Sequence, residues 1–232
     1  MPTVYLIPVS LDEESLQPIP LYVLDAVKDC QVFFTENERT ARRFLKKLWK
    51  EMVIDDYAWF TIHKAEQQAL NEFKRILKEG KNIGIMSEAG CPGIADPGQL
   101  LVAEAHKAGA VIKPLTGPSS ILLALMGSGL NGQQFRFSGY LPIDNTEKIK
   151  VLRELEAESR QKNCTQIFIE TPYRNNALLE TITKVCAPTT LLCVAVNLTA
   201  TSESIQTKPV SEWKKGLPDI HKQPAIFCLL AQ

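Results

Sequence analysis

The sequence of 232 residues predicts an α/β protein of two lobes, the first with a parallel sheet and the second with a mixed sheet. Two observations predict this fold class. In the first half, short apolar segments alternate with helical patterns, which is typical of a parallel sheet covered on both faces. In the second half, the later apolar segments follow one another with little helix between them, which favours hairpins and antiparallel pairing.

Five short apolar runs of the first half are the expected strands. They are 3–9, 31–36, 57–62, 82–87 and 110–115. Helices are expected between them where apolar residues recur at spacings of three and four. They are 40–52, 65–80 and 98–109. The last two helices end at Gly80 and Gly109, because glycine commonly follows the final turn of a helix.

The segment 114–120, P-L-T-G-P-S-S, is the expected boundary between the lobes, because its prolines and glycine interrupt regular structure. We therefore predict an N-terminal lobe over 1–114 and a C-terminal lobe over 115–232. An apolar helix is expected directly after the boundary.

The remaining helices of the C-terminal lobe are expected at about 145–160, which is rich in charge, and at about 175–185. Its strands are expected where apolar and β-branched residues gather between turn signals. They are 135–142, 165–171, 189–199, 203–210 and 224–231.

Composition excludes several classes of protein. The 26 Lys and Arg residues balance the 26 Asp and Glu residues, so a nucleic acid would have to be bound by a local patch. The six cysteines form no Cys-x-x-Cys pair and no Cys/His cluster, so we expect no metal. The first segment lacks the features of a signal peptide, and no apolar run reaches the ~20 residues of a membrane helix. We therefore expect a cytoplasmic protein without a membrane partner.

The stretch S-E-A-G-C-P-G-I-A-D-P-G, residues 87–98, is the strongest candidate binding loop. It follows a predicted buried strand, and loops at the carboxyl ends of parallel strands bind ligands in α/β sheets. Its glycines allow a ligand to approach the main chain, and its prolines make the loop rigid. A long connection capped by Asp96 is the simpler alternative. Cys91 is expected to pack rather than react, because no base or cation flanks it.

A second candidate lies where the C-terminal lobe begins. Ser119 or Ser120 can cap the following helix, and helix N-termini attract anions; a simple capped helix would look the same. Other motifs are missing from the sequence: there is no G-x-G-x-x-G after a strand, no Walker lysine motif and no G-x-S-x-G. The histidines lack triad partners, and His63, which follows a strand, is the one kept as a candidate.

Four segments in order resemble the tetrapyrrole methylase family: 87–98, P-L-T-G-P-S-S at 114–120, G-Y-L-P at 139–142 and I-E-T-P-Y-R at 169–174. Within that family the chain is most similar to the small-subunit ribosomal RNA methyltransferase I branch, which methylates a cytidine ribose 2′-oxygen. The resemblance covers nearly the whole chain. It implies two α/β lobes, S-adenosylmethionine in the cleft between them, and a homodimer.

The resemblance also implies a set of cofactor contacts, largely to the main chain. They are Pro8, Ser87, Glu88, Ala89, Ile94, Ser119, Ser120, Leu198, Pro224, Ala225 and Ile226. S-adenosylmethionine carries an activated methyl group, so the protein has to align the acceptor and assist the loss of its proton.

Four carboxylates at predicted strand ends or in loops are candidates for assisting proton loss; they are Glu36, Glu88, Asp96 and Glu170. Glu36 stands in the family's second-strand motif, and Glu170 and Arg174 match the family's Y-E-S-T-H-R. We therefore predict catalysis or substrate handling by Glu36, Glu170 and Arg174. For each carboxylate, capping or ion pairing is the simpler alternative.

The sequence departs from the family pattern in four places. The first loop, P-T-P-I-G-N-L in the family, is P-V-S-L-D-E-E at 8–14, and A-E-D-T-R is T-E-N-E-R at 35–39. The late A-R-E-L-T-K is A-V-N-L-T-A at 195–200, and K-G-E becomes K-Q-P at 222–224. Acidic charge in the first loop is unfavourable for an RNA substrate. With these departures, the resemblance supports binding of the cofactor better than it supports RNA as the methyl acceptor.

One basic stripe remains on the helix at 40–52 and just before it. It comprises Arg39, Arg43, Lys46, Lys47 and Lys50, which recur every three or four residues. It either docks RNA or is a solvated helix face. Three functions follow: a methyltransferase acting on RNA or a ribosomal subunit, a methyltransferase acting on a tetrapyrrole or other small molecule, and a cofactor-binding module without catalysis.

Overall fold

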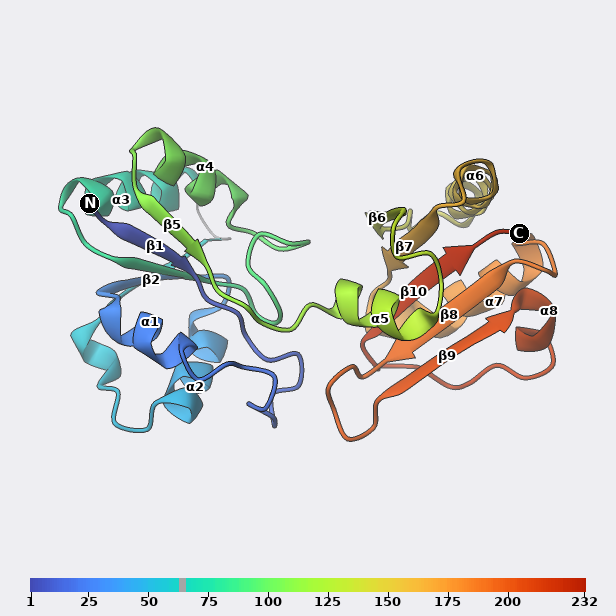
Figure 1. Ribbon diagram of the computed structural model, residues 1–232, viewed down its shortest axis with the longest axis horizontal. Coiled ribbons are helices and arrows are strands. Elements are labelled where there is room, and N and C mark those ends of the chain that lie inside the picture. Colours follow the sequence, from blue (N-terminus) through green and yellow to red (C-terminus); the bar gives the residue numbers. More distant parts are fainter. Residues whose placement is uncertain (63–65) are drawn as a thin grey trace. The chain divides into compact units, whose positions relative to one another are not determined.

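The computed structural model describes residues 1–62 and 66–232 (Figure 1). The chain forms two compact units, residues 1–119 and 120–232. The division falls within the connecting segment 114–120. Among the described residues, no helix combines the length and the apolar character needed to cross a membrane.

The N-terminal unit contains one five-stranded parallel sheet, ordered β3-β2-β4-β1-β5. Its strands are β1 (Thr3–Leu6), β2 (Val32–Thr35), β3 (Ala58–Thr61), β4 (Ile83–Met86) and β5 (Val111–Pro114). Helices connect the strands. They are α1 (Val23–Asp29), α2 (Glu38–Leu48), α3 (Glu66–Lys78) and α4 (Gln99–Lys107), with a 3-10 turn at Ile54–Asp56.

The parallel sheet has a core on each face because successive side chains of a strand point to opposite sides. Phe33 packs with buried residues of α1 and α2 on one face. Phe34, its neighbour, packs with Phe73 of α3 and Leu101 of α4 on the other. In Figure 1 the two helix pairs lie on opposite sides of the sheet. The alternation of strands and helices predicted for this half is confirmed.

The C-terminal unit contains a five-stranded mixed sheet, ordered β6-β7-β10-β8-β9. Its strands are β6 (Phe135–Tyr140), β7 (Thr165–Ile169), β8 (Leu191–Val196), β9 (Ser204–Pro209) and β10 (Ala225–Leu230). β6 and β7 are parallel, whereas β7–β10, β10–β8 and β8–β9 are antiparallel. The late apolar segments therefore pair as predicted.

The helices of this unit are α5 (Ser120–Ser128), α6 (Asn145–Lys162), α7 (Asn175–Val185) and α8 (Val210–Trp213), with a 3-10 turn at Pro172–Arg174. Leu152 of α6 and Leu178 of α7 pack on one face of the sheet with Phe168 and Phe227. α5 lies along β9, where Thr207 Oγ1 donates a hydrogen bond of 2.7 Å to the Ser128 carbonyl.

Two helices of the structure, α1 and α8, were not predicted. α1 has seven residues and no side-chain cap at its start, and α8 has four residues. Helices this short carry too few turns to give a clear apolar period, and tertiary packing stabilises them instead. Val23 and Val27 of α1, and Val210 and Trp213 of α8, are buried.

Candidate functional site

The loops after β1, β4 and β5 meet at the carboxyl edge of the parallel sheet. Val9, after β1, exchanges two main-chain hydrogen bonds with Gly90 in the loop after β4, at 2.8 and 2.9 Å. Gly117, after β5, lies so close to Pro8 that a Cβ at position 117 would be 2.0 Å from the Pro8 Cβ. These three loops are therefore in direct contact with one another at that edge.

The start of the loop at 87–98 is fixed by two hydrogen bonds. Ser87 is buried, and its Oγ donates to the Ala89 carbonyl at 3.0 Å. The Glu88 N–H donates to Glu36 Oε2 at 2.9 Å, which ties the loop to the end of β2. Glu36 is itself half-buried, while Ala89 and Ile94 are exposed. The structure therefore brings Pro8, Ser87, Glu88 and Ala89 to one edge, together with Glu36.

Cys91 packs against the loop after β5. Its Sγ lies 3.5 Å from the Pro118 carbonyl oxygen. Burial, and then the charge of Asp96, raise the pKa of the Cys91 thiol. A raised pKa keeps the sulfur protonated near neutral pH and disfavours nucleophilic chemistry. The structure thus agrees with the packing role expected for this residue.

Other predicted residues have simpler positions. Ser119 ends the N-terminal unit and Ser120 is the first residue of α5. His63 lies outside the described residues. His106 is in the last turn of α4. Among the described residues, no three His, Cys, Asp or Glu side chains gather in a way that could hold a metal ion.

The predicted residues of the C-terminal unit also converge at one edge of their sheet. Ile226 of β10 is paired with Ile169 of β7, so Glu170 follows directly at that edge. Ala225 is paired with Val196, and the Asn197 N–H donates to the Pro224 carbonyl at 3.0 Å. Leu198, the next residue, is buried. The antiparallel register therefore places Glu170, Leu198 and Pro224 to Ile226 together.

Glu170 forms the most buried ion pairs of this edge. Its side chain is 0% exposed, and Arg174 Nη2 and Nε lie 2.6 and 2.9 Å from its Oε1. The Thr171 N–H donates to the same oxygen at 2.8 Å, and Lys148 Nζ lies 3.6 Å from Oε2. Burial would raise the pKa of Glu170, but the hydrogen bonds from Arg174 and Thr171 and the nearby cations hold it below its usual value. Glu170 is therefore a charged carboxylate, and it holds the guanidinium of Arg174 in place.

Three further residues hold this edge together, and sequence reasoning missed them. Lys148 has a side chain only 7% exposed, although it lies on the charge-rich helix α6. Asn175 Nδ2 donates to the Gln223 carbonyl at 2.6 Å, and Asn197 Nδ2 donates to Gln223 Oε1 at 2.8 Å. These amides give no sequence signal, because their partners lie far away in the chain.

The loop after β8 has a strained main chain. Asn197 and Thr199 have φ angles of 49° and 70°, in the left-handed region. Asn tolerates this region better than most residues do. Asn197 occupies the place where the family motif has a glutamate, and here its amide connects the loop to Gln223 and to Ser202 Oγ, at 3.1 Å. At position 197 the chain therefore has an uncharged amide that forms structural hydrogen bonds, where the family motif has a charged carboxylate.

Comparisons with known proteins agree with this architecture. The solved structure of the methyltransferase CobJ superposes over 99% of this chain and 93% of its own, with a TM-score of 0.64 and 16% identity. The uroporphyrin-III-C-methyltransferase from Thermus thermophilus gives a TM-score of 0.57 at 15% identity, covering 99% and 92% of the two chains. At such low identities these likenesses show the fold.

Two sequence relatives carry the name ribosomal RNA small subunit methyltransferase I. The protein from Escherichia coli O157:H7 is 37% identical over 154 residues, which are 66% of this chain and 52% of that protein. The protein from Vibrio cholerae is 30% identical over 214 residues, 91% of this chain and 70% of that protein. The chain thus spans about half the length of the first relative, at 52%. The sequence profile of the tetrapyrrole (corrin/porphyrin) methylases matches residues 3–213, and the chain belongs to that family.

Proposed function

We propose that the chain is an S-adenosylmethionine-dependent methyltransferase acting on RNA, with a cytidine ribose 2′-oxygen of the small ribosomal subunit as acceptor. The observation that carries the proposal is the match, over 91% of this chain, to a relative named for this class of ribosomal RNA methylation. The acceptor within the RNA is inferred from the family branch that the motifs resemble.

The residues at the edge of the N-terminal unit fit a cofactor held mainly through main-chain atoms. Ala89 is exposed in the loop after β4 and has a small side chain, while Ser87 and Gly90 are buried at the same edge. Ser10, in the loop after β1, has a buried hydroxyl with no hydrogen-bond partner among the described residues. Together with Pro8, these residues would hold the cofactor. Leu198 and Pro224 to Ile226 stay predicted contacts on the ground of the family resemblance.

Bound S-adenosylmethionine supplies an activated methyl group. The chain's own task is to orient the ribose hydroxyl and accept its proton. Glu36 is the best placed carboxylate of the N-terminal unit, because the hydrogen bond from the Glu88 N–H orients it at the edge. Glu170 is better suited to position Arg174, whose side chain is 34% exposed and can contact substrate phosphate.

The test is methyl transfer from labelled S-adenosylmethionine to small ribosomal subunits that lack the modification. The proposal predicts label at one cytidine whose 3′ linkage becomes resistant to alkali, because methylation removes the attacking hydroxyl. Glu36→Gln keeps an oxygen for the Glu88 N–H; it should lower kcat while leaving cofactor affinity unchanged. Label on a porphyrin or corrin precursor in place of RNA would contradict the proposed acceptor.

Binding of the cofactor without turnover is a second candidate, favoured by one observation. Both predicted carboxylates already have partners, since Glu36 accepts from Glu88 and Glu170 is paired with Arg174 and Lys148. Cofactor binding by calorimetry, combined with no label in any acceptor, would favour this candidate over the enzyme.

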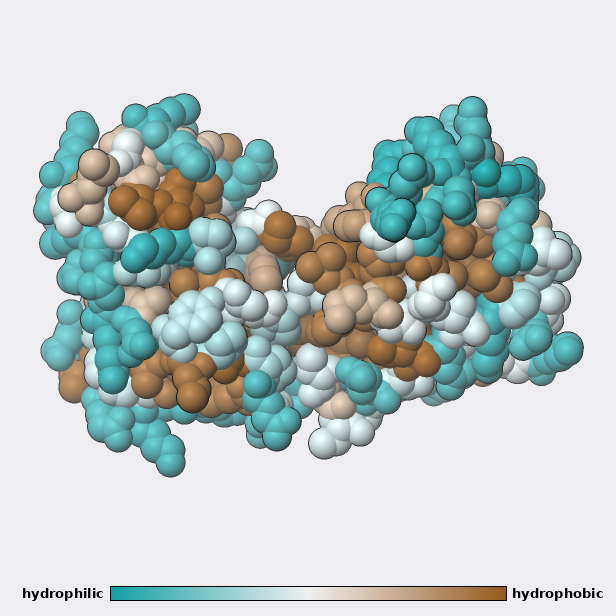
Figure 2. All heavy atoms as spheres, viewed as in Figure 1, coloured by the Kyte–Doolittle hydropathy of each residue, from teal (hydrophilic) through white to brown (hydrophobic). Residues whose placement is uncertain are grey.

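We also propose a homodimer in the cytoplasm, where ribosomal subunits are made. Apolar side chains gather over α5 and the neighbouring strands of the C-terminal unit in Figure 2. On α5, Leu122 is 49% exposed and Met126 is 78% exposed. Exposed apolar patches of this kind mark association surfaces. Met126→Glu should shift the sedimentation profile to monomer; a wild-type monomer would contradict the dimer.

A further inference from the structure

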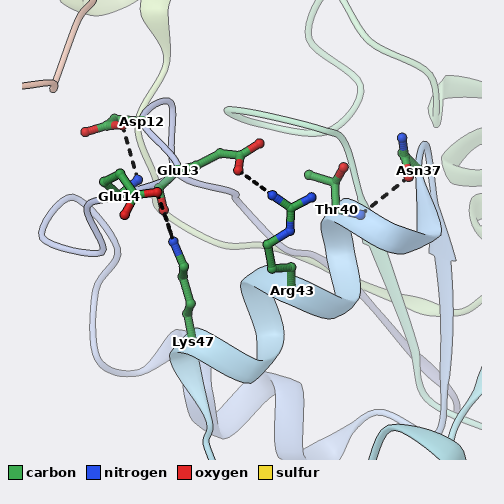
Figure 3. Close-up of polar contacts among 7 residues, drawn as sticks. All are labelled: Asp12, Glu13, Glu14, Asn37, Thr40, Arg43 and Lys47. Atoms are coloured by element: carbon green, nitrogen blue, oxygen red, sulfur yellow. Dashed lines mark hydrogen bonds and ion pairs between the residues drawn. The ribbon is translucent and has the colours of Figure 1, made fainter.

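The acidic first loop and the basic helix α2 are joined by ion pairs. Arg43 Nη1 lies 2.8 Å from Glu13 Oε2. Lys47 Nζ donates to the Glu13 carbonyl at 2.5 Å and lies 3.7 Å from Glu14 Oε1. Figure 3 shows Arg43 and Lys47 extending from successive turns of α2 toward this loop. Two of the three acidic residues of this loop, Glu13 and Glu14, are therefore neutralised by two residues of the basic stripe.

Arg43 and Lys47 lie on the same face of α2. The helix begins after Asn37, whose side chain accepts from the Arg39 and Thr40 N–H groups at 3.1 and 3.4 Å. Residues four apart lie on one face, about 6 Å apart along the axis. Arg43 and Lys47 therefore present two cations in a row on one side of the helix.

Two other basic residues of α2, Lys46 and Arg42, form different contacts. Lys46 Nζ donates to the Lys50 and Met52 carbonyls at 2.5 and 2.9 Å, which satisfies acceptors at the end of the helix. Arg42 pairs with Glu38 at 2.5 Å and lies over the Trp59 ring at 5.1 Å. Arg43 and Lys47 are set apart because they bind acidic residues from another element.

These pairs with the first loop are exposed to solvent. The side chains of Arg43 and Glu13 are 50% and 60% exposed, and those of Lys47 and Glu14 are 37% and 86% exposed. Exposed ion pairs contribute only about 0–1 kcal/mol each. A polyanion that offers several phosphates, and that releases counterions on binding, can therefore replace the carboxylates.

We propose that Arg43 and Lys47 are phosphate contacts for the RNA acceptor, and that Glu13 and Glu14 occupy them until RNA binds. This inference rests on the proposed function. Arginine binds phosphate in a bidentate manner, and lysine binds it as a point charge. The loop that would be released also carries Pro8 and Val9, which contact the loops after β5 and β4. RNA contact and the candidate cofactor edge are thus linked through one short segment.

The experiment measures the affinity of the full chain for small ribosomal subunits across a range of salt concentrations. Arg43→Gln with Lys47→Gln should weaken binding several-fold and lower the salt slope by about 1.4–1.8, as expected for two lost phosphate contacts. The matched control is Lys150→Gln with Lys184→Gln, which removes two exposed, paired lysines of α6 and α7. The control should retain the wild-type affinity and slope.

The opposite change tests the role of the loop. Glu13→Gln with Glu14→Gln should tighten binding several-fold, because RNA no longer has to displace two carboxylates. Its matched control is Glu154→Gln with Glu180→Gln, which removes the acidic partners of Lys150 and Lys184. Glu14→Gln alone keeps the contacts of Glu13 with α2 and should tighten binding by a smaller factor. Because the loop stays attached to α2 in this variant, tighter binding could not be explained by a loosened loop.

Three outcomes separate this inference from the proposed function. Wild-type protein that methylates subunits, with Arg43→Gln/Lys47→Gln retaining wild-type affinity and slope, would overturn the phosphate contacts alone. Equal changes in the test variants and their controls would also overturn them, because the effect would then belong to total charge. Wild-type protein that binds S-adenosylmethionine but neither binds nor methylates subunits would overturn both the inference and the RNA acceptor.

Discussion

Gly117 lies directly against the ring of Pro8. A Cβ at position 117 would be 2.0 Å from Pro8 Cβ and 2.5 Å from Pro8 Cγ, closer than any two such atoms can approach. The contact joins the loops after β5 and β1, and Val9, the next residue, is bridged to Gly90 of the loop after β4. The loops at the edge of the parallel sheet are therefore packed so closely that position 117 has no room for a side-chain atom.

Gly117→Ala should destabilise the protein by about 1–3 kcal/mol, as overpacking generally does. It should also weaken S-adenosylmethionine binding, because the loops after β1 and β5 must move apart. Gly132→Ala is the matched control, since a Cβ at Gly132 meets nothing within 4 Å. Urea unfolding and calorimetry measure the two effects. An alanine at 117 with wild-type stability and affinity would mean that this contact does not hold the edge.

Glu170→Gln should cost about 3–5 kcal/mol of stability, because it leaves the buried Lys148 ammonium without its carboxylate. Glu154→Gln, which breaks an exposed pair with Lys150, should cost less than about 1 kcal/mol. Urea unfolding compares the two. Equal losses would mean that the pairs of Glu170 are no stronger than those at the surface.

The stability that Glu170 contributes should depend on pH in a definite direction. Its pKa in the folded protein is lowered, because hydrogen bonds from Arg174 and Thr171 outweigh the effect of burial. The contribution is therefore complete above the unfolded value of about 4.3 and is lost as pH falls through the folded value. The difference in unfolding free energy between wild type and Glu170→Gln should be constant from about pH 5 to 7 and shrink below about pH 4. A difference that grows toward acid would show that burial dominates instead.

Asn197 should tolerate glycine better than alanine. Both substitutions remove the hydrogen bonds to Gln223 and Ser202, but only alanine is strained at a φ of 49°. The strain adds about 1 kcal/mol to the loss for Asn197→Ala. Thermal unfolding of the two variants measures the difference. Equal stability would mean that the loop relaxes out of the left-handed conformation.

Most of the fold could be predicted from sequence because its signals are local. Buried strands such as Ile83–Met86 are short apolar runs, and α3 has a clear apolar period that ends before Gly80. The pairing order β6-β7-β10-β8-β9 could not be predicted, because it depends on contacts between strands far apart in the sequence. The helix α1 was missed because packing, rather than a local signal, specifies it.

The candidate site could be predicted only at the level of motifs. The segments 87–98 and 169–174 lie at the ends of β4 and β7, as the strand predictions implied. Their hydrogen-bond partners could not be predicted, since Glu88 binds Glu36 and Glu170 binds Lys148 across long stretches of chain. The partners of the first loop are likewise distant in sequence: its acidic charge predicted repulsion of RNA, whereas the structure pairs Glu13 with Arg43.

Calorimetric titration of S-adenosylmethionine into wild type and Ala89→Trp tests the central claim most directly. Ala89 is exposed in the loop after β4, so tryptophan should block the cofactor without disturbing the core. Ala157→Trp, at an exposed position of α6, is the control. We predict saturable binding by wild type and the control, and none by Ala89→Trp at unchanged melting temperature. Equal binding by all three proteins, or none by wild type, would contradict a cofactor site built on the loops after β1, β4 and β5.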